Sequence, residues 1–426
     1  MAVSPSHILG MNARYKYTRY NTTKSKSYGF SKLRTKELLN THSIPTAQVY
    51  HIFAGLHDLE DIRWEVIPTP FVMKPASGSA GKGIIIITQK VANQSEWITS
   101  EGERLDDEDL TLHVSNILDG EFSTWGSSHK AIIEEMIPPH PALAKYSYKG
   151  TPDIRVIIFN SVPVMAMARI PTKESHGKAN LDRGAIGLGI DMATGITTNG
   201  LYGKSSHITH FPDNHKKVNG IMIPEWKKLL TVAVEAANAA GYTFMGADLF
   251  IHPEKGPMIV ELNGYPGLSI QLANRSGLKR RLERVEGLDV RDAEHGVKIA
   301  QALFAENFSD NIRVEGGLQI IPTNPVMTIY GDNKDNKTIS GLVNTGRNRS
   351  AISMKLAEEL GLLDFDDLLW QQKEVEGKVP VVEVTYSIKN KRKKTAMVVT
   401  KRLDRLKHKV ELGRRDTAGF LIGETS

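Results

Sequence analysis

Two apolar segments joined by a short polar turn constrain this chain more than any other feature. Met245–His252 (MGADLFIH) and Met258–Asn263 (MIVELN) are each typical of a β-strand, and the four residues 253–256 favour a hairpin loop. If His252 faces Pro257, the register places Asp248 opposite Glu261, with Asn263 on the same face. Opposed carboxylates repel unless a cation lies between them, and oxygen ligands suit Mg²⁺. The hairpin therefore predicts a metal site; a solvated face with incidental acids is the alternative.

A glycine- and serine-rich loop, KPASGSAGKG at residues 74–83, precedes four consecutive isoleucines at 84–87. Its small residues allow backbone N–H groups to surround phosphate oxygens. Because β-branched isoleucines favour a strand, the loop is predicted to join two strands. Rossmann and P-loop glycine motifs open a helix, so both are excluded. Such a loop is more often an ordinary turn, but together with the metal hairpin it indicates a nucleotide.

The order of these motifs resembles that of the ATP-grasp ligases, specifically the α-L-glutamate ligase-like relatives of the enzymes that add glutamate to ribosomal protein tails. The resemblance covers residues 8–290. Besides the loop and the hairpin, it includes the motifs ILGMNARY, SKLRTKELL, EEMI, PDIRVIIF, MAMARIPT, GKANLDRGAIGLGIDMATG and VELNGYPGLSIQLAN. It implies an α+β fold, in which two α+β subdomains grip ATP.

The resemblance also assigns nucleotide contacts by position. Lysine supplies a compact charge to phosphate, and Lys32 and Lys74 match the two family lysines that reach the phosphates. Backbone groups of Glu135 and Ile137, in the segment 131–137, match the adenine hinge, and Asp153 matches the ribose contact. The flap over the phosphates corresponds to Gly78, Ser79, Ala80, Gly81 and Gly83.

The reacting groups are assigned in the same way. Arg155 and Arg169 lie on two strand-like segments separated by the turn at residues 160–161, and match arginines that hold the γ-phosphate and the acyl phosphate. This bidentate task suits a guanidinium group. Asn180 matches an asparagine near the metal. The implied ligands of Mg²⁺, with Mn²⁺ as an alternative ion, are Asp248, Glu261 and Asn263.

The chain departs from the family pattern beside the acceptor. Phe30 and Ser31 stand before Lys32 where relatives have two aspartates, and residues 180–183 have the sequence NLDR in place of Asn-Leu-His-Gln. These changes leave the identity of the acceptor open. Residues 1–30 are too few to form the domain that glutamate ligases carry there, so they are expected to form an arm. Part of the usual substrate wall is therefore expected to be missing.

A second domain is predicted after Gly316 and Gly317, which gives an ATP-grasp domain at 31–310 and a further domain at 317–426. Within the ATP-grasp domain, helices are predicted at 224–240, with proline in the first turn, and at 291–304. The first of these helices has one apolar stripe, made of Leu229, Leu230, Ala233, Val234 and Ala237. Short strands are expected at 326–330, 337–343, 380–387 and 395–400, as in a small all-β barrel. GLVNTGRNRSAISMKLAEELGL and VELGRRDTAGFLI resemble the retropepsin-type aspartic proteases. Asn344 stands where that family has its catalytic aspartate, and an amide is not a general base at ordinary pH. The resemblance implies an inactive protease domain and a homo-oligomer.

Composition bounds the setting. The chain has 426 residues, no cysteine and a formal net charge of +6, which excludes disulfides and thiolate chemistry. It has no apolar run near the length of a membrane span and no signal-like N-terminus, so a cytoplasmic protein is expected. A basic stretch at 389–409 is more typical of a solvated hairpin tip than of a nucleic-acid site, because aromatic residues are not interleaved with it.

These observations predict an ATP- and Mg²⁺-dependent carboxylate–amine ligase that forms an amide through an acyl phosphate and releases ADP and phosphate. The expected substrates are an amino acid such as glutamate and a peptide or small molecule. Two other classes remain open. One is a retropepsin-type peptidase whose ATP-grasp half regulates it, and Asn344 argues against it. The other is a non-catalytic binding protein gated by nucleotide.

Overall fold

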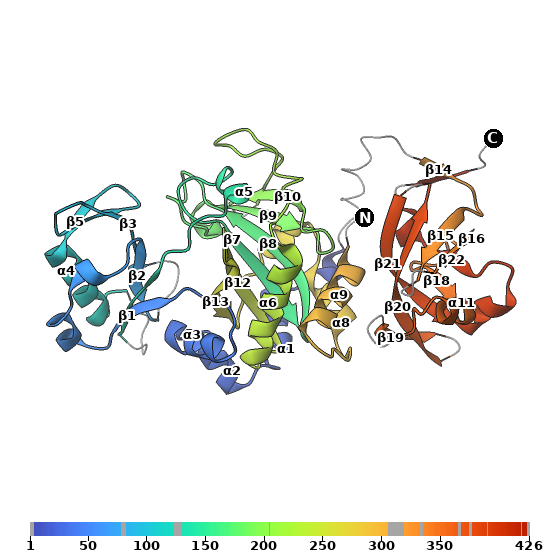
Figure 1. The fold of residues 1–426 in the computed structure, drawn as a ribbon, viewed down its shortest axis with the longest axis horizontal. Coiled ribbons are helices and arrows are strands. Elements are labelled where there is room, and N and C mark those ends of the chain that lie inside the picture. Colours follow the sequence, from blue (N-terminus) through green and yellow to red (C-terminus); the bar gives the residue numbers. More distant parts are fainter. Residues whose placement is uncertain are drawn as a thin grey trace. The chain divides into compact units, whose positions relative to one another are not determined.

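The computed structural model describes residues 4–77, 82–122, 129–203, 205–305, 319–331, 335–364, 368–374, 377–389, 391–418 and 420–423. The chain divides into two compact units (Figure 1). The first comprises Met1–Ile190 and Gly195–Glu286, and the second comprises Asp191–Thr194 and Gly287–Ser426. The residues predicted to mark the domain boundary, Gly316 and Gly317, lie outside the described part of the chain.

The N-terminal segment, expected to be an arm, is helical and belongs to the first unit. It forms α1 (Met11–Thr18) and α2 (Thr23–Tyr28), and Thr22 caps α2 by accepting a hydrogen bond from Ser25 N–H at 3.1 Å. The Asn21 amide accepts from Phe244 N–H at 2.9 Å and donates to the Phe244 carbonyl at 2.7 Å. These bonds fasten the segment to the start of β12 (Phe244–His252).

The next helix, α3 (Lys32–Thr41), leads into a small six-stranded sheet. α4 (Asp107–Leu118) buries Leu110 and Val114 in the same core as Trp97 and Phe71. β2 and β3 form the predicted flap hairpin. The strands are β1 (Val49–Phe53), β2 (Phe71–Pro75), β3 (Ile85–Lys90), β4 (Glu96–Thr99), β5 (Arg104–Asp106) and β6 (Ala131–Glu135), in the order β1-β6-β2-β3-β4-β5.

A seven-stranded antiparallel sheet forms the centre of the first unit (Figure 1). Its order is β11-β10-β9-β8-β7-β12-β13. The strands other than β12 are β7 (Asp153–Phe159), β8 (Val162–Ile170), β9 (Ile186–Ile190), β10 (Thr197–Tyr202), β11 (Ser206–Ile208) and β13 (Gly256–Asn263). The helices after α4 in this unit are α5 (Pro141–Ala144), α6 (Trp226–Ala239), α7 (Ile270–Asn274) and α8 (Leu278–Val285).

The predicted helix at 224–240 is present but begins later. Glu225 has φ of 49°, in the left-handed region, so α6 begins at Trp226 and Pro224 is not in its first turn. The predicted apolar stripe is confirmed, because its residues are all buried. They are Leu229, Leu230, Ala233, Val234 and Ala237.

The β12–β13 hairpin confirms one part of its predicted register and corrects another. Asp248 lies opposite Glu261, as expected. However, His252 pairs with Gly256 rather than Pro257, and the turn is residues 253–255, one residue shorter than predicted. An irregularity between Asp248 and Leu249 absorbs the one-residue difference, since Leu249 pairs with Ile259. A β-bulge thus restores the opposition of the two acids.

The second unit consists mainly of strands, and those expected at 326–330, 337–343, 380–387 and 395–400 are found with small shifts. The expectation of an all-β domain is corrected by two short helices, α11 (Met354–Glu359) and α12 (Arg414–Thr417). α9 (Ala293–Phe304), predicted within the ATP-grasp domain, groups with this unit. The strands are β14 (Gln319–Ile321), β15 (Val326–Tyr330), β16 (Asn336–Ser340), β17 (Leu342–Val343), β18 (Ala351–Ser353), β19 (Leu368–Glu374), β20 (Gly377–Ile388), β21 (Lys391–Thr400), β22 (Val410–Leu412) and β23 (Phe420–Ile422).

The larger sheet of this unit has the order β16-β15-β20-β21-β18-β22-β17, with β19 paired to β20. β14 and β23 form a separate parallel pair. The core of this unit contains fully buried side chains of β20 and β21 together with Leu356 of α11. Those of the two strands include Val382, Val384, Tyr386 and Met397. Within the described part of the chain, no helix has the length and apolar character needed to cross a membrane.

Candidate active site

The two opposed acids of the β12–β13 hairpin stand at the centre of the site. Asp248 is buried, with 4% of its surface exposed, and Glu261 is half-buried. Asn263 lies two residues beyond Glu261 on the same face of β13. Its side-chain oxygen accepts a hydrogen bond from Tyr265 N–H at 2.9 Å. The hairpin thus brings the three predicted metal ligands to one face.

Two arginines from the adjacent β7–β8 hairpin pair with Asp248. Arg155 donates two hydrogen bonds to its carboxylate, at 2.7 and 2.6 Å, and Arg169 donates one at 2.8 Å. Arg169 also pairs with Asp153, which lies directly opposite it in the β7–β8 register. The predicted turn at Asn160 and Ser161 joins these strands, and both of its residues have φ above 50°. The two arginines predicted to act together are therefore adjacent.

Asp153, predicted as the ribose contact, forms an ion pair in this structure. Its carboxylate is buried and ion-paired with Arg169, so it forms part of the acid–arginine cluster. The ribose role stays a prediction. Asn180, predicted near the metal, caps a short turn by accepting from Asp182 N–H at 2.9 Å, and it lines the same pocket as Arg155.

The three acids of this cluster, Asp248, Asp153 and Glu261, have pKa values that are shifted in different directions. Burial by itself would raise the pKa of Asp248, but the guanidinium groups of Arg155 and Arg169 lower it to about 2. Burial raises the pKa of Asp153 to about 6. Burial and the charge of Asp248 also raise the pKa of Glu261. Glu261 is thus an acid whose charged form lacks full compensation, which is the electrostatic pattern of a position that receives a cation.

Lysines converge on the other side of this centre. Burial and the nearby charge of Lys74 lower the pKa of Lys32. Lys32 N–H donates to the Ala76 carbonyl at 3.0 Å, which ties the start of α3 to the end of β2. Lys74 is buried and pairs with Glu134 on β6. Both predicted phosphate lysines therefore lie at the base of the flap.

A third buried lysine completes this group. Lys36 lies 2.9 Å from Glu134 and donates to the Ala47 carbonyl at 2.8 Å. Burial lowers the pKa of Lys36. Burial alone would raise the pKa of Glu134, but the charges of Lys74 and Lys36 lower it below its ordinary value. Sequence reasoning missed this residue, although Lys36 lies one helical turn after Lys32 and so on the same face of α3.

The predicted adenine hinge follows β6. Glu135 N–H donates to the Gln48 carbonyl at 2.8 Å, and the Ile137 carbonyl accepts from the Thr151 hydroxyl at 3.0 Å. The Glu135 carboxylate pairs with Lys255. The Ile137 side chain is buried. The two peptide groups are therefore held in place by other parts of the unit, which favours a fixed edge for recognition.

The flap is described only at its base. Gly78, Ser79, Ala80 and Gly81 lie outside the described residues. Gly83 has φ of +68°, and a Cβ added there would lie 2.6 Å from the Phe122 ring. Its carbonyl is 3.0 Å from His113 Nε2. Only glycine fits this position, which anchors the second half of the flap to α4.

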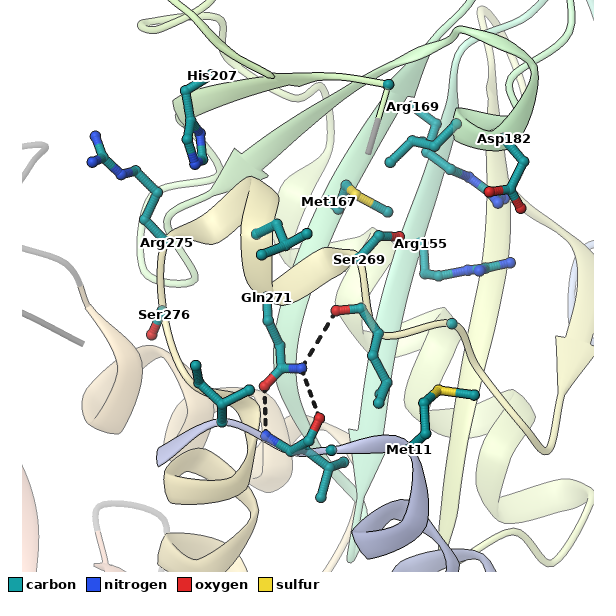
Figure 2. Close-up of a pocket in the computed structure, with 18 of the residues that line it drawn as sticks. Met11, Arg155, Met167, Arg169, Asp182, His207, Ser269, Gln271, Arg275 and Ser276 are labelled. Atoms are coloured by element: carbon teal, nitrogen blue, oxygen red, sulfur yellow. Dashed lines mark hydrogen bonds between the residues drawn. The ribbon is translucent and has the colours of Figure 1, made fainter. Parts of the chain in front are cut away.

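A cavity of about 890 Å³ opens beside the arginines. Arg155, Arg169, Asn180 and Asp182 line one end, and Figure 2 shows His207 and Arg275 at the other. The N-terminal residues Ile8–Met11 form part of its wall. The N-terminal segment, expected to be an arm, thus supplies part of the wall, and the loss of the rest of the usual substrate wall stays a prediction.

Gln271 on α7 holds that wall in place. Its side chain accepts from Leu9 N–H at 2.8 Å and donates to the Leu9 carbonyl at 3.1 Å (Figure 2). It also accepts from Leu278 N–H at 2.9 Å. Gln271, His207 and Arg275 were not predicted. Gln271 lies in the motif VELNGYPGLSIQLAN and Arg275 directly follows it, but only the tertiary structure shows that they line one cavity with His207.

The first unit has an ATP-grasp fold. A sequence model of the sugar-transfer associated ATP-grasp family matches residues 10–287, and the chain belongs to that family. A search of curated proteins found no match. The match ends at residue 287, so it does not cover the rest of the second unit, which continues to Ser426.

Several solved structures are similar at low identity. The ATP-grasp ligase PsnB with its minimal precursor is 13% identical, covers 63% of each chain and has a TM-score of 0.35. D-alanine–D-alanine ligase from Bacillus anthracis is 14% identical over 72% of this chain and 77% of its own, with a TM-score of 0.34. L-amino acid ligase from Bacillus licheniformis is 12% identical over 61% of this chain and 48% of its own, with a TM-score of 0.34. Residue roles therefore rest on this chain's own geometry.

Proposed function

We propose that the chain is an ATP- and Mg²⁺-dependent carboxylate–amine ligase that releases ADP and phosphate. The observation that carries this proposal is the Asp248–Glu261 pair, with two arginines beside it at the end of a large cavity and lysines at the base of a glycine-rich flap. This set contains groups for a metal, for phosphate oxygens and for a substrate. In this proposal an amino acid such as glutamate is one substrate, and it is added to a peptide or small molecule.

ATP would lie between the small sheet and the central sheet. Lys32 and Lys74 would contact its phosphates, and their convergence at the base of the flap supports this role. Adenine would use the Glu135 carbonyl and the Ile137 N–H. The other two groups, the Glu135 N–H and the Ile137 carbonyl, already form hydrogen bonds within the protein. Glu134 holds Lys74 toward this space by an ion pair.

The acids fit a divalent cation. A carboxylate accepts about four hydrogen bonds, and Asp248 accepts three from the arginines, which leaves one position on Oδ1. Burial and the charge of Asp248 raise the pKa of Glu261, so a cation beside it would stabilise its charged form. Mg²⁺ held by Asp248, Glu261 and Asn263 would neutralise charge on the ATP phosphates. An Mn²⁺ ion would use the same oxygen ligands.

The reaction would proceed in two transfers. An oxygen of the substrate carboxylate attacks the γ-phosphorus of ATP, the bond from that phosphorus to the bridging oxygen breaks, and ADP leaves. An amine nitrogen then attacks the acyl carbon of the acyl phosphate, phosphate departs, and the nitrogen loses a proton. Arg155 and Arg169 stabilise the charge that develops on the transferred phosphoryl group, because planar guanidinium groups bind its oxygens in pairs. The chain needs no side-chain nucleophile for either step.

Product analysis tests the proposal. The full chain is incubated with Mg²⁺, ATP, hydroxylamine and a panel of amino acids and other carboxylic acids. Hydroxylamine captures an acyl phosphate as a stable hydroxamate, so carboxylate-dependent hydroxamate with equal amounts of ADP and phosphate is expected. Release of AMP and pyrophosphate would refute the acyl phosphate route.

We further propose that the second unit has a retropepsin-like fold without protease activity. Asn344 lies in a turn where its side-chain oxygen accepts from Gly346 N–H at 3.1 Å, and its amide donates to Glu411 at 3.3 Å. An amide at this point supplies no base to activate water. The homo-oligomer expected from this resemblance is tested by light scattering of the full chain.

A further inference from the structure

The end of the cavity away from Arg155 carries positive charge of its own. Arg275 and His207 line it, and Figure 2 shows their side chains together, with Asp182 at the opposite end. Both residues are exposed, and neither side chain has a hydrogen-bond or ion-pair partner among the described residues. We propose that the substrate carboxylic acid has an apolar body and a second anionic group, which Arg275 and His207 bind. This inference rests on the ligase function proposed above.

The charge balance distinguishes the two ends. At the reacting end, Arg155 and Arg169 are matched by the carboxylates of Asp153 and Asp248. Among the residues that line the cavity, Asp182 is the only carboxylate, and it lies at the reacting end (Figure 2). Arg275 therefore has no opposing charge within the cavity. A guanidinium at the end of a concave site selects an anion, and two parallel N–H groups give that contact direction.

The backbone at Arg275 indicates that its position is fixed. The residue caps α7 with φ of 47°, in the left-handed region, where glycine or asparagine is the usual choice. Ser276 N–H donates to the Gln271 carbonyl at 3.1 Å, and the Gln271 side chain binds both Leu9 and Leu278. The cap is thus held at several points. An arginine kept in an unfavourable conformation at the rim of a cavity is a candidate for a binding role.

The wall between the two ends is mainly apolar. Leu9 of the N-terminal segment, Met167 of β8, and Leu268 and Leu272 at α7 contribute to it. A charged segment of ligand here would lose water without gaining a partner, whereas a hydrocarbon segment would gain from burial. The volume of about 890 Å³ is in the range of sites that enclose ligands of drug size. The shape therefore favours an extended substrate over a lone small amino acid.

Binding of linear diacids tests this inference without requiring turnover. The full chain is loaded with Mg²⁺ and a non-hydrolysable ATP analogue, and calorimetry measures affinity for α,ω-dicarboxylates of six to twelve carbons. The matched ligand is the monomethyl ester of each acid, which keeps the length and removes the distal charge. We expect the best diacid to bind about tenfold more tightly than its ester. ω-Phosphonocarboxylates of the same length show whether carboxylate or phosphate is preferred at the distal end.

Variants separate a binding role from a structural one. Arg275→Gln is expected to remove the tenfold preference and leave affinity for the ester unchanged. Arg280→Gln, at an exposed arginine on α8 that does not line the cavity, should keep the preference. The inference is wrong if the unmodified chain binds diacid and ester equally, if no diacid binds, or if Arg275→Gln weakens both ligands alike.

The hydroxamate experiment keeps this inference distinct from the function on which it rests. A diacid preference that depends on Arg275, without hydroxamate, would refute the ligase proposal and retain the distal anion site. Hydroxamate from many carboxylic acids, without any preference for a second charge, would retain the ligase and refute the distal site.

Discussion

Each unit of this chain holds an acid beside arginines, and the two acids differ in how far their charge is compensated. The carboxylate of Glu411 in the second unit lies 2.6 Å from the Arg402 guanidinium and 3.9 Å from that of Arg347. It also accepts a hydrogen bond from the side-chain amide of Asn344. Glu261 of the first unit faces a second carboxylate, Asp248, and its pKa is raised. A buried charge that is fully paired serves structure, whereas one left partly unpaired beside a cavity marks a position for a ligand.

Removing one charge from each acid gives the largest expected difference between the units. Glu261→Gln should lower Mg²⁺-dependent ATP turnover on the order of 10³-fold, because it removes a charged metal ligand. Glu411→Gln makes the same chemical change in the second unit and should leave turnover within about twofold. Turnover is measured as carboxylate-dependent ADP release at saturating Mg²⁺. Near-normal activity of Glu261→Gln would show that the metal is bound elsewhere.

The compensated acid of the first unit, Glu134, provides a second comparison. It pairs with Lys36 and Lys74 in a buried group, so Glu134→Gln leaves two buried lysines without their partner. We expect the free energy of unfolding at pH 7 to fall by about 3 kcal/mol. Urea denaturation measures this. Glu135→Gln is the control, because its partner Lys255 is half exposed and such pairs contribute less than about 1 kcal/mol.

The same acid predicts a pH dependence. Burial alone would raise the pKa of Glu134. The charges of Lys74 and Lys36 outweigh burial and hold this pKa below its ordinary value of 4.5 in the folded protein. Stability from this group is therefore complete above pH 4.5 and is lost as pH falls below 4.5 toward the lowered folded-state pKa. The variant should lose less stability than the unmodified chain over this acid range. Parallel pH profiles would contradict the assigned ion pairing.

Much of the first unit could be predicted because its signals are local. Alternation along β12 and β13 indicated the hairpin, and the spacing of Arg155 and Arg169 across a short turn indicated that they meet. The bulge near Asp248 could not be predicted, since a one-residue irregularity leaves little trace in an alternating pattern. The prediction of opposed acids was correct although its assumed partner for His252 was wrong.

The far end of the cavity lay beyond sequence reasoning for a different reason. Arg275 follows α7, His207 lies on β11, and Leu9 belongs to the N-terminal segment. Only tertiary packing brings these residues together. The Asp153–Arg169 ion pair was likewise missed, although both residues had been selected, because a resemblance assigned them separate partners. Register, once known, places them directly opposite each other.

The smallest predicted effect is on stability, and it tests whether a second carboxylate can be accommodated beside Glu411 of the second unit. Asn344→Asp would place a second carboxylate where the amide now donates to Glu411 at 3.3 Å. The lost hydrogen bond and the new repulsion are partly offset by Arg347 and Arg402, so we expect a loss of about 1 kcal/mol in the free energy of unfolding at pH 7. Repulsion raises the pKa of the introduced acid, and protonation restores a donor, so the loss should shrink as pH falls toward 5. Denaturation of both proteins at pH 7 and pH 5 measures this, with Asn344→Ala as the control whose loss does not depend on pH. A stability loss of Asn344→Asp that is the same at both pH values would show that Asn344 and Glu411 are not coupled, and that the comparison between the two acids is wrong.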